Sequence, residues 1–419
     1  MSNQKLVKLN QLCDKITDGS HFSPKGITSG IPMLSVKDMR ENGFSYSDCK
    51  YISSGDYADL SKYDCKPLLN DVLIAKDGSY LKHVFVIKKE IDQAVLSSIG
   101  ILRPNLKKVV PEYLKYYLQT ESVKETVSKK YVSGSALPRI ILKNFGEIDI
   151  LYKDLPIQQK IASVLSALDA KIELNNRINA ELEAMAKTLY DYWFMQFDFP
   201  DANDKPFKTS GGKMVWSEEL KREVPDGWEV KKIKEFAKTG SGGTPLSTKQ
   251  EYYIDGKIPW INSGEVNSSF IIESKNFITE EGLNNSSAKI FPKGTILMAM
   301  YGATAGQVSL MDIDACTNQA ICAIMPNDKR ISPYLKFGLH QIYQYLINLS
   351  SGSARDNLSQ DKIKELLFAI PEEKILQDYY DFANQCFKKI LINIKENQQL
   401  KLLRDWLLPM MMNGQVKVN

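Results

Sequence analysis

The sequence carries one pattern twice, and this duplication constrains the fold more than any other feature. In the first half, Thr17-Asp-Gly-Ser-His-Phe-Ser-Pro24 precedes Gly30-Ile-Pro-Met-Leu-Ser-Val-Lys-Asp38. In the second half, Thr239-Gly-Ser-Gly-Gly-Thr-Pro245 precedes Lys257-Ile-Pro-Trp-Ile-Asn-Ser-Gly-Glu265. Each pair shares a Gly/Ser loop that ends in proline and an apolar strand that begins with Ile-Pro. Repeats at a fixed spacing indicate two copies of one structural unit.

Further matches follow in the same order. Asp71-Val-Leu-Ile-Ala-Lys-Asp-Gly78 corresponds to Thr295-Ile-Leu-Met-Ala-Met-Tyr-Gly302, and Ser133-Gly-Ser-Ala136 corresponds to Ser351-Gly-Ser-Ala354. The offset in residue number stays at roughly 220 and drifts slowly, as small loop insertions between two copies of one fold would make it do. We therefore predict an internal repeat over almost the whole chain.

Each copy contains a strand-rich part followed by a long helix. Short β-branched runs separated by Gly, Pro, Asn and Ser indicate strands, and short helices are expected at Pro111–Thr120 and Pro333–Leu349. We predict an α+β fold of two similar globular domains alternating with two long helices. The predicted boundaries are 1–154 and 229–370 for the domains, 155–197 and 371–419 for the helical regions, and 198–228 for a polar, Gly/Pro-rich linker.

The two long helices have apolar stripes with coiled-coil spacing. The first stripe comprises Ile161, Leu165, Leu168, Ile172, Leu182, Ala186, Leu189 and Trp193; the second comprises Leu376, Tyr380, Ala383, Phe387, Ile390, Ile394, Leu400, Leu403 and Leu407. Either stripe alone also fits an ordinary amphipathic helix on a domain surface. Two stripes at matched repeat positions favour burial against each other. Asn175, Asn179 and Asn397 interrupt the stripes, either as solvated residues or, as we expect, as residues that fix the register.

The chemistry of an enzyme is missing from the sequence. There is no P-loop, no Asn/Asp-Pro-Pro-aromatic methyltransferase motif and no Gly-x-Ser-x-Gly elbow. Three histidines and six dispersed cysteines offer no metal-site spacing, so we predict a non-catalytic protein without metal or cofactor. The sequence shows neither a signal peptide nor a membrane span, which indicates a cytoplasmic protein.

Binding of a polyanion explains the duplicated loops better. Glycine allows close backbone approach, hydroxyl and amide groups contact phosphate, and several polar side chains can read base edges. A plain hairpin turn is the alternative for both glycine loops. The candidate DNA contacts are Thr17, Asp18, Gly19, Ser20, His21, Lys37, Lys76, Ser79, Tyr80, Arg139, Ser241, Gly242, Gly243, Thr244, Ser263, Tyr301, Thr304, Arg355 and Asn357. The net charge of +4 permits nucleic-acid binding without requiring it.

Together these motifs resemble those of the DNA specificity (S) subunits of Type I restriction-modification systems. The likeness covers the duplicated loops, the segment Pro156-Ile-Gln-Gln-Lys-Ile161 and the linker that begins Phe197-Asp-Phe-Pro. The second copy departs from the pattern at Pro371-Glu-Glu-Lys-Ile375, where the glutamine pair is missing.

The resemblance implies two target recognition domains that each read a short half-site of double-stranded DNA. It also implies that the two helical regions form an antiparallel coiled coil that docks two methyltransferase subunits. Restriction subunits, which translocate DNA, would join them. A helix from Pro156 to Phe194 is about 58 Å long, which limits the separation of the half-sites to about 17 base pairs. Because the loops of the two copies differ, we expect an asymmetric bipartite target. The alternatives are a coiled-coil scaffold or adaptor that binds protein, and a fused methylase-specificity chain, which would need an active-site motif.

Overall fold

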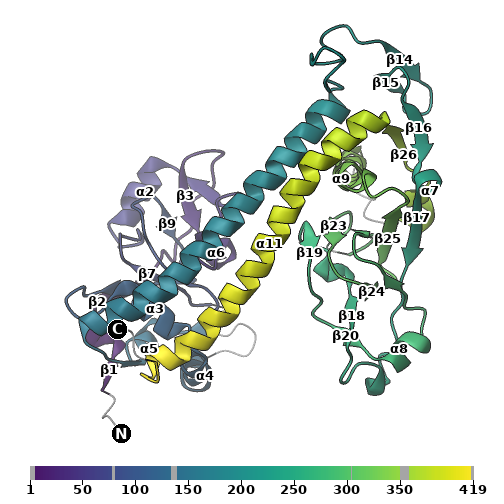
Figure 1. The fold of residues 1–419 in the computed structure, drawn as a ribbon. Helices are drawn as coiled ribbons and strands as arrows, with labels where there is room; N and C mark the ends of the chain where they lie inside the picture. The colour runs from purple at the N-terminus through teal and green to yellow at the C-terminus, as the bar shows by residue number, and fades with distance from the viewer. Residues whose placement is uncertain (1–4, 78–80, 134–138, 303, 350–357, 417–419) are drawn as a thin grey trace. The chain divides into compact units, whose positions relative to one another are not determined.

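The computed structural model describes residues 5–77, 81–133, 139–302, 304–349 and 358–416. The chain forms two units, each held together by its own contacts. Unit 1 comprises Met1–Ile172 and Gln399–Asn419, and unit 2 comprises Glu173–Gln398. Figure 1 shows the mixed helices and strands of each unit and the two long helices, α6 and α11.

Unit 1 is built on a four-stranded antiparallel sheet with the order β2-β10-β7-β8. A second sheet has the order β6-β3-β9, and β1 pairs with β13. Its strands are β1 (Leu6–Lys8), β2 (Cys13–Asp18), β3 (Ile31–Leu34), β4 (Met39–Arg40), β5 (Gly43–Phe44), β6 (Lys50–Ile52), β7 (Val72–Ala75), β8 (Val84–Val86), β9 (Ala94–Val95), β10 (Ile99–Pro104), β11 (Val132–Ser133), β12 (Arg139–Ile140) and β13 (Asp149–Leu151). Its short helices are α1 (Leu9–Leu12), α2 (Ser54–Ser61), α3 (Pro111–Leu118), α4 (Glu121–Lys130) and α5 (Leu142–Phe145).

Unit 2 has a five-stranded sheet with the order β17-β25-β22-β23-β19 and a four-stranded sheet with the order β20-β18-β24-β21. Its strands are β14 (Met214–Ser217), β15 (Arg222–Pro225), β16 (Glu229–Lys232), β17 (Ala237–Ser241), β18 (Ile258–Ile261), β19 (Phe270–Ile271), β20 (Phe277–Ile278), β21 (Ile290–Phe291), β22 (Ile296–Ala299), β23 (Val308–Met311), β24 (Ala315–Thr317), β25 (Ile321–Pro326) and β26 (Leu367–Ile370). Its short helices are α7 (Ile233–Phe236), α8 (Glu280–Asn284), α9 (Ile331–Leu349) and α10 (Gln360–Lys364).

The strand pairings confirm the internal repeat. In unit 1, β3 pairs in parallel with β9 through Met33 and Ala94, and in unit 2, β18 pairs in parallel with β24 through Trp260 and Cys316. Each of these parallel pairs lies beside an antiparallel neighbour, β6 in unit 1 and β20 in unit 2. The β1–β13 pair likewise corresponds to β16–β26. Two segments with the same apolar pattern have thus folded to the same topology.

The two long helices are α6 (Leu155–Tyr190) and α11 (Glu373–Met412), and a π-helical turn, Asp191–Met195, follows α6. Within unit 2 they run antiparallel, because residues 175 and 179 of α6 meet residues 397 and 393 of α11. The residues of the expected seam are buried, as Ile161, Leu165 and Ala186 are, or half-buried, with one exception. Leu403 is an exception at 42% exposed, since Met411 and Met412 fill the adjoining core of unit 1 instead.

The departure at Pro371-Glu-Glu-Lys-Ile375 has a structural reason. In unit 1, the buried side chain of Gln158 accepts from the amide of Val110 at 2.8 Å and donates to the carbonyl of Lys108 at 3.1 Å. At the matching place in unit 2, Glu373 pairs with Arg330 at 3.0 Å. In unit 2 an ion pair therefore takes the place of the glutamine hydrogen bonds of unit 1. Each contact joins the start of a long helix, α6 or α11, to the segment before a shorter helix, α3 or α9.

The segment 198–228, expected as a polar linker, is folded. It contains the β14–β15 hairpin, and three of its aromatic residues, Phe199, Phe207 and Trp228, pack in the core of unit 2. Phe199 stacks on Phe207 at 4.6 Å between ring centroids and on Trp228 at 5.3 Å. The Gly/Pro-rich composition concealed this cluster, because its aromatic residues are far apart in the sequence.

Candidate nucleic-acid interface

In unit 1, the predicted loop Thr17–His21 lines a cavity of about 380 Å³ at the end of β2. Two strongly exposed aromatic residues, Phe22 and Tyr63, lie at the same cavity. His21 is exposed, and its Nε2 lies 3.4 Å from Oδ1 of Asp18. The loop therefore places aromatic and polar groups at one surface, a combination suited to contact with a nucleic acid.

Lys76 does not face solvent as a base-reading residue would. It is 5% exposed, and its ammonium forms an ion pair with Asp18. In unit 2 the equivalent positions are Met300, which is also buried, and Ser241. The structure assigns Lys76 to support of the loop, because a buried lysine requires a counter-charge.

The glycines of both loops are explained by close packing. A Cβ on Gly19 would lie 2.1 Å from the carbonyl oxygen of Val95, and one on Gly242 would lie 1.8 Å from that of Thr317. These are matching positions of the repeat. The amide of Gly19 donates to Ile99 and that of Ser20 donates to Val95. These two amides are used within the domain, which favours the hairpin alternative for the backbone and leaves the side chains of Thr17, Asp18 and His21 as the predicted contacts.

In unit 2, three predicted residues converge on one that the sequence analysis missed, Gln319. Ser241 Oγ donates to the carbonyl of Gln319 at 3.2 Å, and the Tyr301 hydroxyl lies 3.4 Å from the same oxygen. Thr244 Oγ1 donates to the side-chain oxygen of Gln319 at 2.7 Å. Gln319 is exposed, and the loops that hold it come from three separate parts of the sequence. The sequence feature that could have identified Gln319 is its place in the turn between β24 and β25, at the position where the first copy has Ser97.

Three more predicted residues lie in adjoining loops of unit 2, and a fourth lies in unit 1. Thr304 Oγ1 donates to the carbonyl of Ser263 at 2.7 Å, which joins two loops of unit 2. The buried Gly243 lies against Ser287, and its carbonyl accepts from the indole of Trp260 at 3.0 Å. In unit 1, Lys37 lies in a 3-10 turn between β3 and β4, and its ammonium is 3.4 Å from the carbonyl of Asp48.

Some predicted contacts cannot be placed by their side chains. Ser79, Tyr80, Arg355 and Asn357 lie outside the described residues, and of Arg139 only its backbone place in β12 is described. These five stay predictions from the sequence.

The asparagines expected to fix the helix register meet across the helix pair. Asn175 Nδ2 donates to Asn397 Oδ1 at 2.9 Å and to Glu396 at 2.7 Å. Asn393, which the sequence analysis missed, donates to Asn179 at 2.8 Å, and Asn397 donates to Asn176 at 2.9 Å. This polar cluster is largely buried and supports a role in register.

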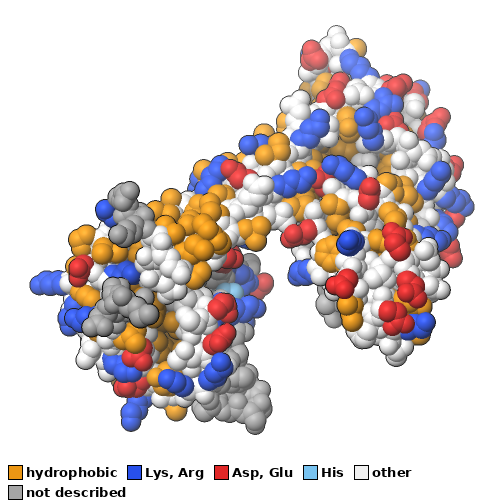
Figure 2. Space-filling model, turned by 60° about the horizontal axis from the view of Figure 1, so that its bottom comes forward, with side chains coloured by type: hydrophobic (Ala, Val, Ile, Leu, Met, Phe, Trp, Pro, Cys, Tyr) orange, Lys and Arg blue, Asp and Glu red, His pale blue; other side chains and the backbone are white. Residues whose placement is uncertain are grey.

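In the face shown in Figure 2, Lys and Arg are interspersed with Asp and Glu, so no single-sign field covers this face. Among the described residues, no group of three or more His, Cys, Asp or Glu side chains is placed to hold a metal ion. None of the helices in those parts of the chain has the length and apolar character that a membrane crossing requires.

The chain is thus a duplicated α+β domain with two long helices and with polar loops at matching positions of the two copies. The family model of the Type I restriction modification DNA specificity domain matches residues 1–184 and 225–402. The chain is 30% identical to the Type I restriction enzyme MjaIX specificity subunit of Methanocaldococcus jannaschii, over 74% of this chain and 70% of that protein. It is 27% identical to the HindI specificity subunit of Haemophilus influenzae, over 99% of this chain and all of that protein.

Comparison of structures gives the same fold. The crystal structure of a Type I restriction-modification S subunit from M. genitalium matches with a TM-score of 0.57 at 17% identity, over 98% of this chain and 97% of that one. The chain belongs to the family of Type I restriction-modification specificity subunits. It is a non-catalytic component that recognises DNA and works with methyltransferase and restriction subunits.

Proposed function

We propose that the chain reads an asymmetric bipartite DNA target, with one half-site for each unit. The observation that carries this proposal is the cluster around Gln319 in unit 2, whose counterpart in unit 1 is built from different groups. Unit 1 has the Asp18–Lys76 ion pair where unit 2 has Ser241 and Met300. Two copies of one scaffold with different polar groups at the same loops are suited to two different sequences.

The chemistry of Gln319 fits base reading. A glutamine side chain can contact N6 and N7 of adenine with two hydrogen bonds in the major groove. Thr244 orients the exposed carboxamide through its hydroxyl, and Ser241 and Tyr301 hold the backbone. The residue is therefore held in place before DNA arrives, which reduces the entropy lost on binding.

The test is methylome sequencing of a methylation-free host that expresses the chain with its methyltransferase subunit. We expect a split motif with modified adenine on both strands. Gln319→Ala should lose discrimination at one position of one half-site, worth about 1–3 kcal/mol, and Tyr301→Ala should affect the same half. The control is Gln196→Ala, which removes an exposed glutamine of the same unit that lies outside this cluster.

Lys76→Ala should weaken reading of the other half-site, because it leaves Asp18 without its counter-ion. A continuous motif would contradict the bipartite proposal. Equal loss at both halves in the Gln319 variant would contradict its role as a reader. A wild-type complex that methylates nothing and shows no salt-dependent DNA binding would favour the scaffold alternative.

We also propose that two methyltransferase subunits dock on the long helices and that restriction subunits then join the complex. Near its end, α11 exposes Leu402, Leu403 and Trp406 at 71%, 42% and 55% of their surfaces. Large apolar residues on one stretch of helix are typical of an interaction site, and tryptophan is enriched at interface centres.

The double variant Leu402→Ser/Trp406→Ser should reduce co-purification of the methyltransferase subunit, with a loss of about 2 kcal/mol or more. The variant Leu106→Ser removes a similarly exposed leucine from a loop of unit 1 and is the matched control. Sedimentation of the wild-type complex distinguishes one docked subunit from two. Undiminished binding by the double variant would place the docking surface elsewhere.

A further inference from the structure

Each copy of the repeat buries one lysine at the same position. The matching sequences Tyr113-Leu-Lys115 in α3 and Tyr334-Leu-Lys336 in α9 place Lys115 at 7% exposure and Lys336 at 4%. Removing an ammonium group from water is costly unless it is paired. Both lysines are paired, and both partners are carboxylates of α6.

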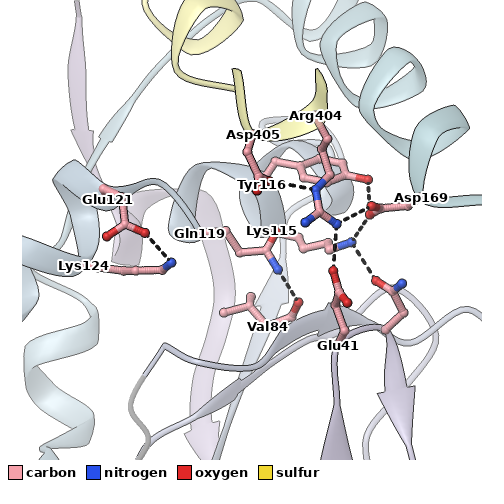
Figure 3. A network of polar contacts seen from close by, with 11 residues as sticks. Glu41, Val84, Lys115, Tyr116, Gln119, Glu121, Lys124, Asp169, Arg404 and Asp405 are labelled. Carbon is pink, nitrogen blue, oxygen red and sulfur yellow. Dashed lines mark hydrogen bonds and ion pairs between the residues drawn. The ribbon is translucent and has the colours of Figure 1, made fainter. Parts of the chain in front are cut away.

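In unit 1 the partner is Asp169, shown in Figure 3. Lys115 Nζ lies 2.7 Å from Asp169 Oδ2 and donates to Asn42 Oδ1 at 3.3 Å. The Tyr116 hydroxyl donates to the same carboxylate oxygen at 2.7 Å. From α11, Arg404 reaches Asp169 Oδ1 at 2.9 Å and Glu41 at 2.8 Å. Asn42 and Glu41 form the turn of the β4–β5 hairpin, so the network joins this hairpin and α3 to both long helices.

In unit 2 the partner is Glu183. Lys336 Nζ lies 2.8 Å from Glu183 Oε1, and the hydroxyl of Ser269 donates to the same oxygen. Ser269 directly precedes β19 and corresponds to Asn42 in the repeat. The rings of Phe270, Phe337 and Phe387 surround the ammonium at 4.7–5.6 Å from their centroids. Both units therefore bring together the same three kinds of group. These are a helix lysine, a carboxylate of α6, and a polar residue of the segment that matches the β4–β5 turn.

The two clusters differ in strength. In unit 1 the carboxylate also receives the Tyr116 hydroxyl and the Arg404 guanidinium, whereas unit 2 has Phe337 in place of Tyr116. In unit 2, Glu183 pairs with Lys336, and the Glu183 side chain is 30% exposed. Directional contacts of this kind add little stability compared with apolar packing, but they accept only one geometry.

We propose that Lys115 with Asp169, and Lys336 with Glu183, are positioning contacts that fix the orientation of each DNA-reading domain on α6 and so the gap length accepted between the half-sites. The inference rests on the proposed function, since it needs two half-sites separated by unread base pairs. Small errors of placement matter here, because a displacement of about 1 Å can reduce the rate of a positioned reaction by about 10²-fold.

The experiment compares methylation rates of the full complex on duplexes that carry the native gap, one base pair more, or one fewer. The variants are Lys115→Met and Lys336→Met, which keep the side-chain stem and remove the charge. Lys336→Met should reduce the preference for the native gap by about tenfold while the half-site sequences stay the same. Lys115→Met should have a smaller effect, because Arg404 and Tyr116 still hold Asp169.

The control is Lys221→Met, which removes a lysine from an exposed ion pair with Glu218. Lys336→Arg should restore the preference if the charge contact positions the domain. Glu183→Gln, which keeps the size of the side chain, serves if the Lys336→Met variant does not fold. A purely structural role would lower the unfolding temperature and leave gap preference unchanged, which would overturn the inference. A wild-type complex without a bipartite target would overturn the proposed function instead.

Discussion

At the residue scale, the two copies show how one scaffold accommodates different groups. Asp18 and Lys76 form a buried ion pair in unit 1, and the matching residues of unit 2 are Ser241 and the buried Met300. Both members of the pair differ together, since either charge alone would be buried without a counter-ion. The loop around Gly19 or Gly242 has a close contact in each case, because the glycine packs against Val95 of β9 in unit 1 and against Thr317 of β24 in unit 2.

The Asp169 carboxyl predicts a pH dependence of stability. Burial favours its neutral form, but Lys115, Arg404 and Tyr116 outweigh burial and hold its pKa below the ordinary value, which is about 4. The folded protein therefore binds the proton less readily, and the stabilisation is present above about pH 4 and is lost as the pH falls through the lowered pKa.

Asp169→Asn should destabilise unit 1 at pH 7 by about 3–5 kcal/mol and flatten its loss of stability in acid. Urea unfolding between pH 3 and pH 7 measures both effects. Asp59→Asn, which alters an exposed ion pair with Lys62, should change neither. The interpretation fails if the Asp169 variant keeps the wild-type slope in acid.

At the scale of elements, the polar cluster between α6 and α11 sets the pairing of two long helices. Asn175, Asn179, Asn393 and Asn397 are joined by hydrogen bonds that form at one register, whereas apolar side chains alone tolerate slippage. The side-chain oxygen of Asn175 is buried with no partner, which is a cost in stability. Such a cost is typical of residues that specify geometry.

The double variant Asn179→Leu/Asn393→Leu should raise the free energy of unfolding by about 1 kcal/mol, measured as a higher urea midpoint, and lower the rate of target methylation. The apolar pair removes the desolvation cost, and the helices lose a contact that selects one register. Leu182→Ile, in the same seam, is the control for changed packing. A lower midpoint with unchanged methylation would show that the asparagines serve stability and not register.

At the scale of the whole molecule, each unit has its own apolar core, and the long helices contribute to both. Ile161 and Leu165 of α6 belong to the core of unit 1 with Met411 of α11, whereas Ala186 and Phe387 belong to that of unit 2. The boundaries of the units, at residues 172 and 398, lie inside the two helices. The expected boundaries between domains and helical regions thus follow the sequence repeat. The boundaries of the packed units instead fall within the long helices.

The sequence by itself determined the duplication, the order of elements and most of the apolar seam, because periodicity and turn residues are local signals. It also located the loops that meet around Gln319 and three of the asparagines. Only the tertiary structure decided that Lys76 is buried, that Leu403 is exposed and that the segment 198–228 is folded. It also paired Lys336 with Glu183 of α6, the helix that follows the other copy. These contacts join residues far apart in the chain, so no local pattern records them; they form only when packing brings the segments together.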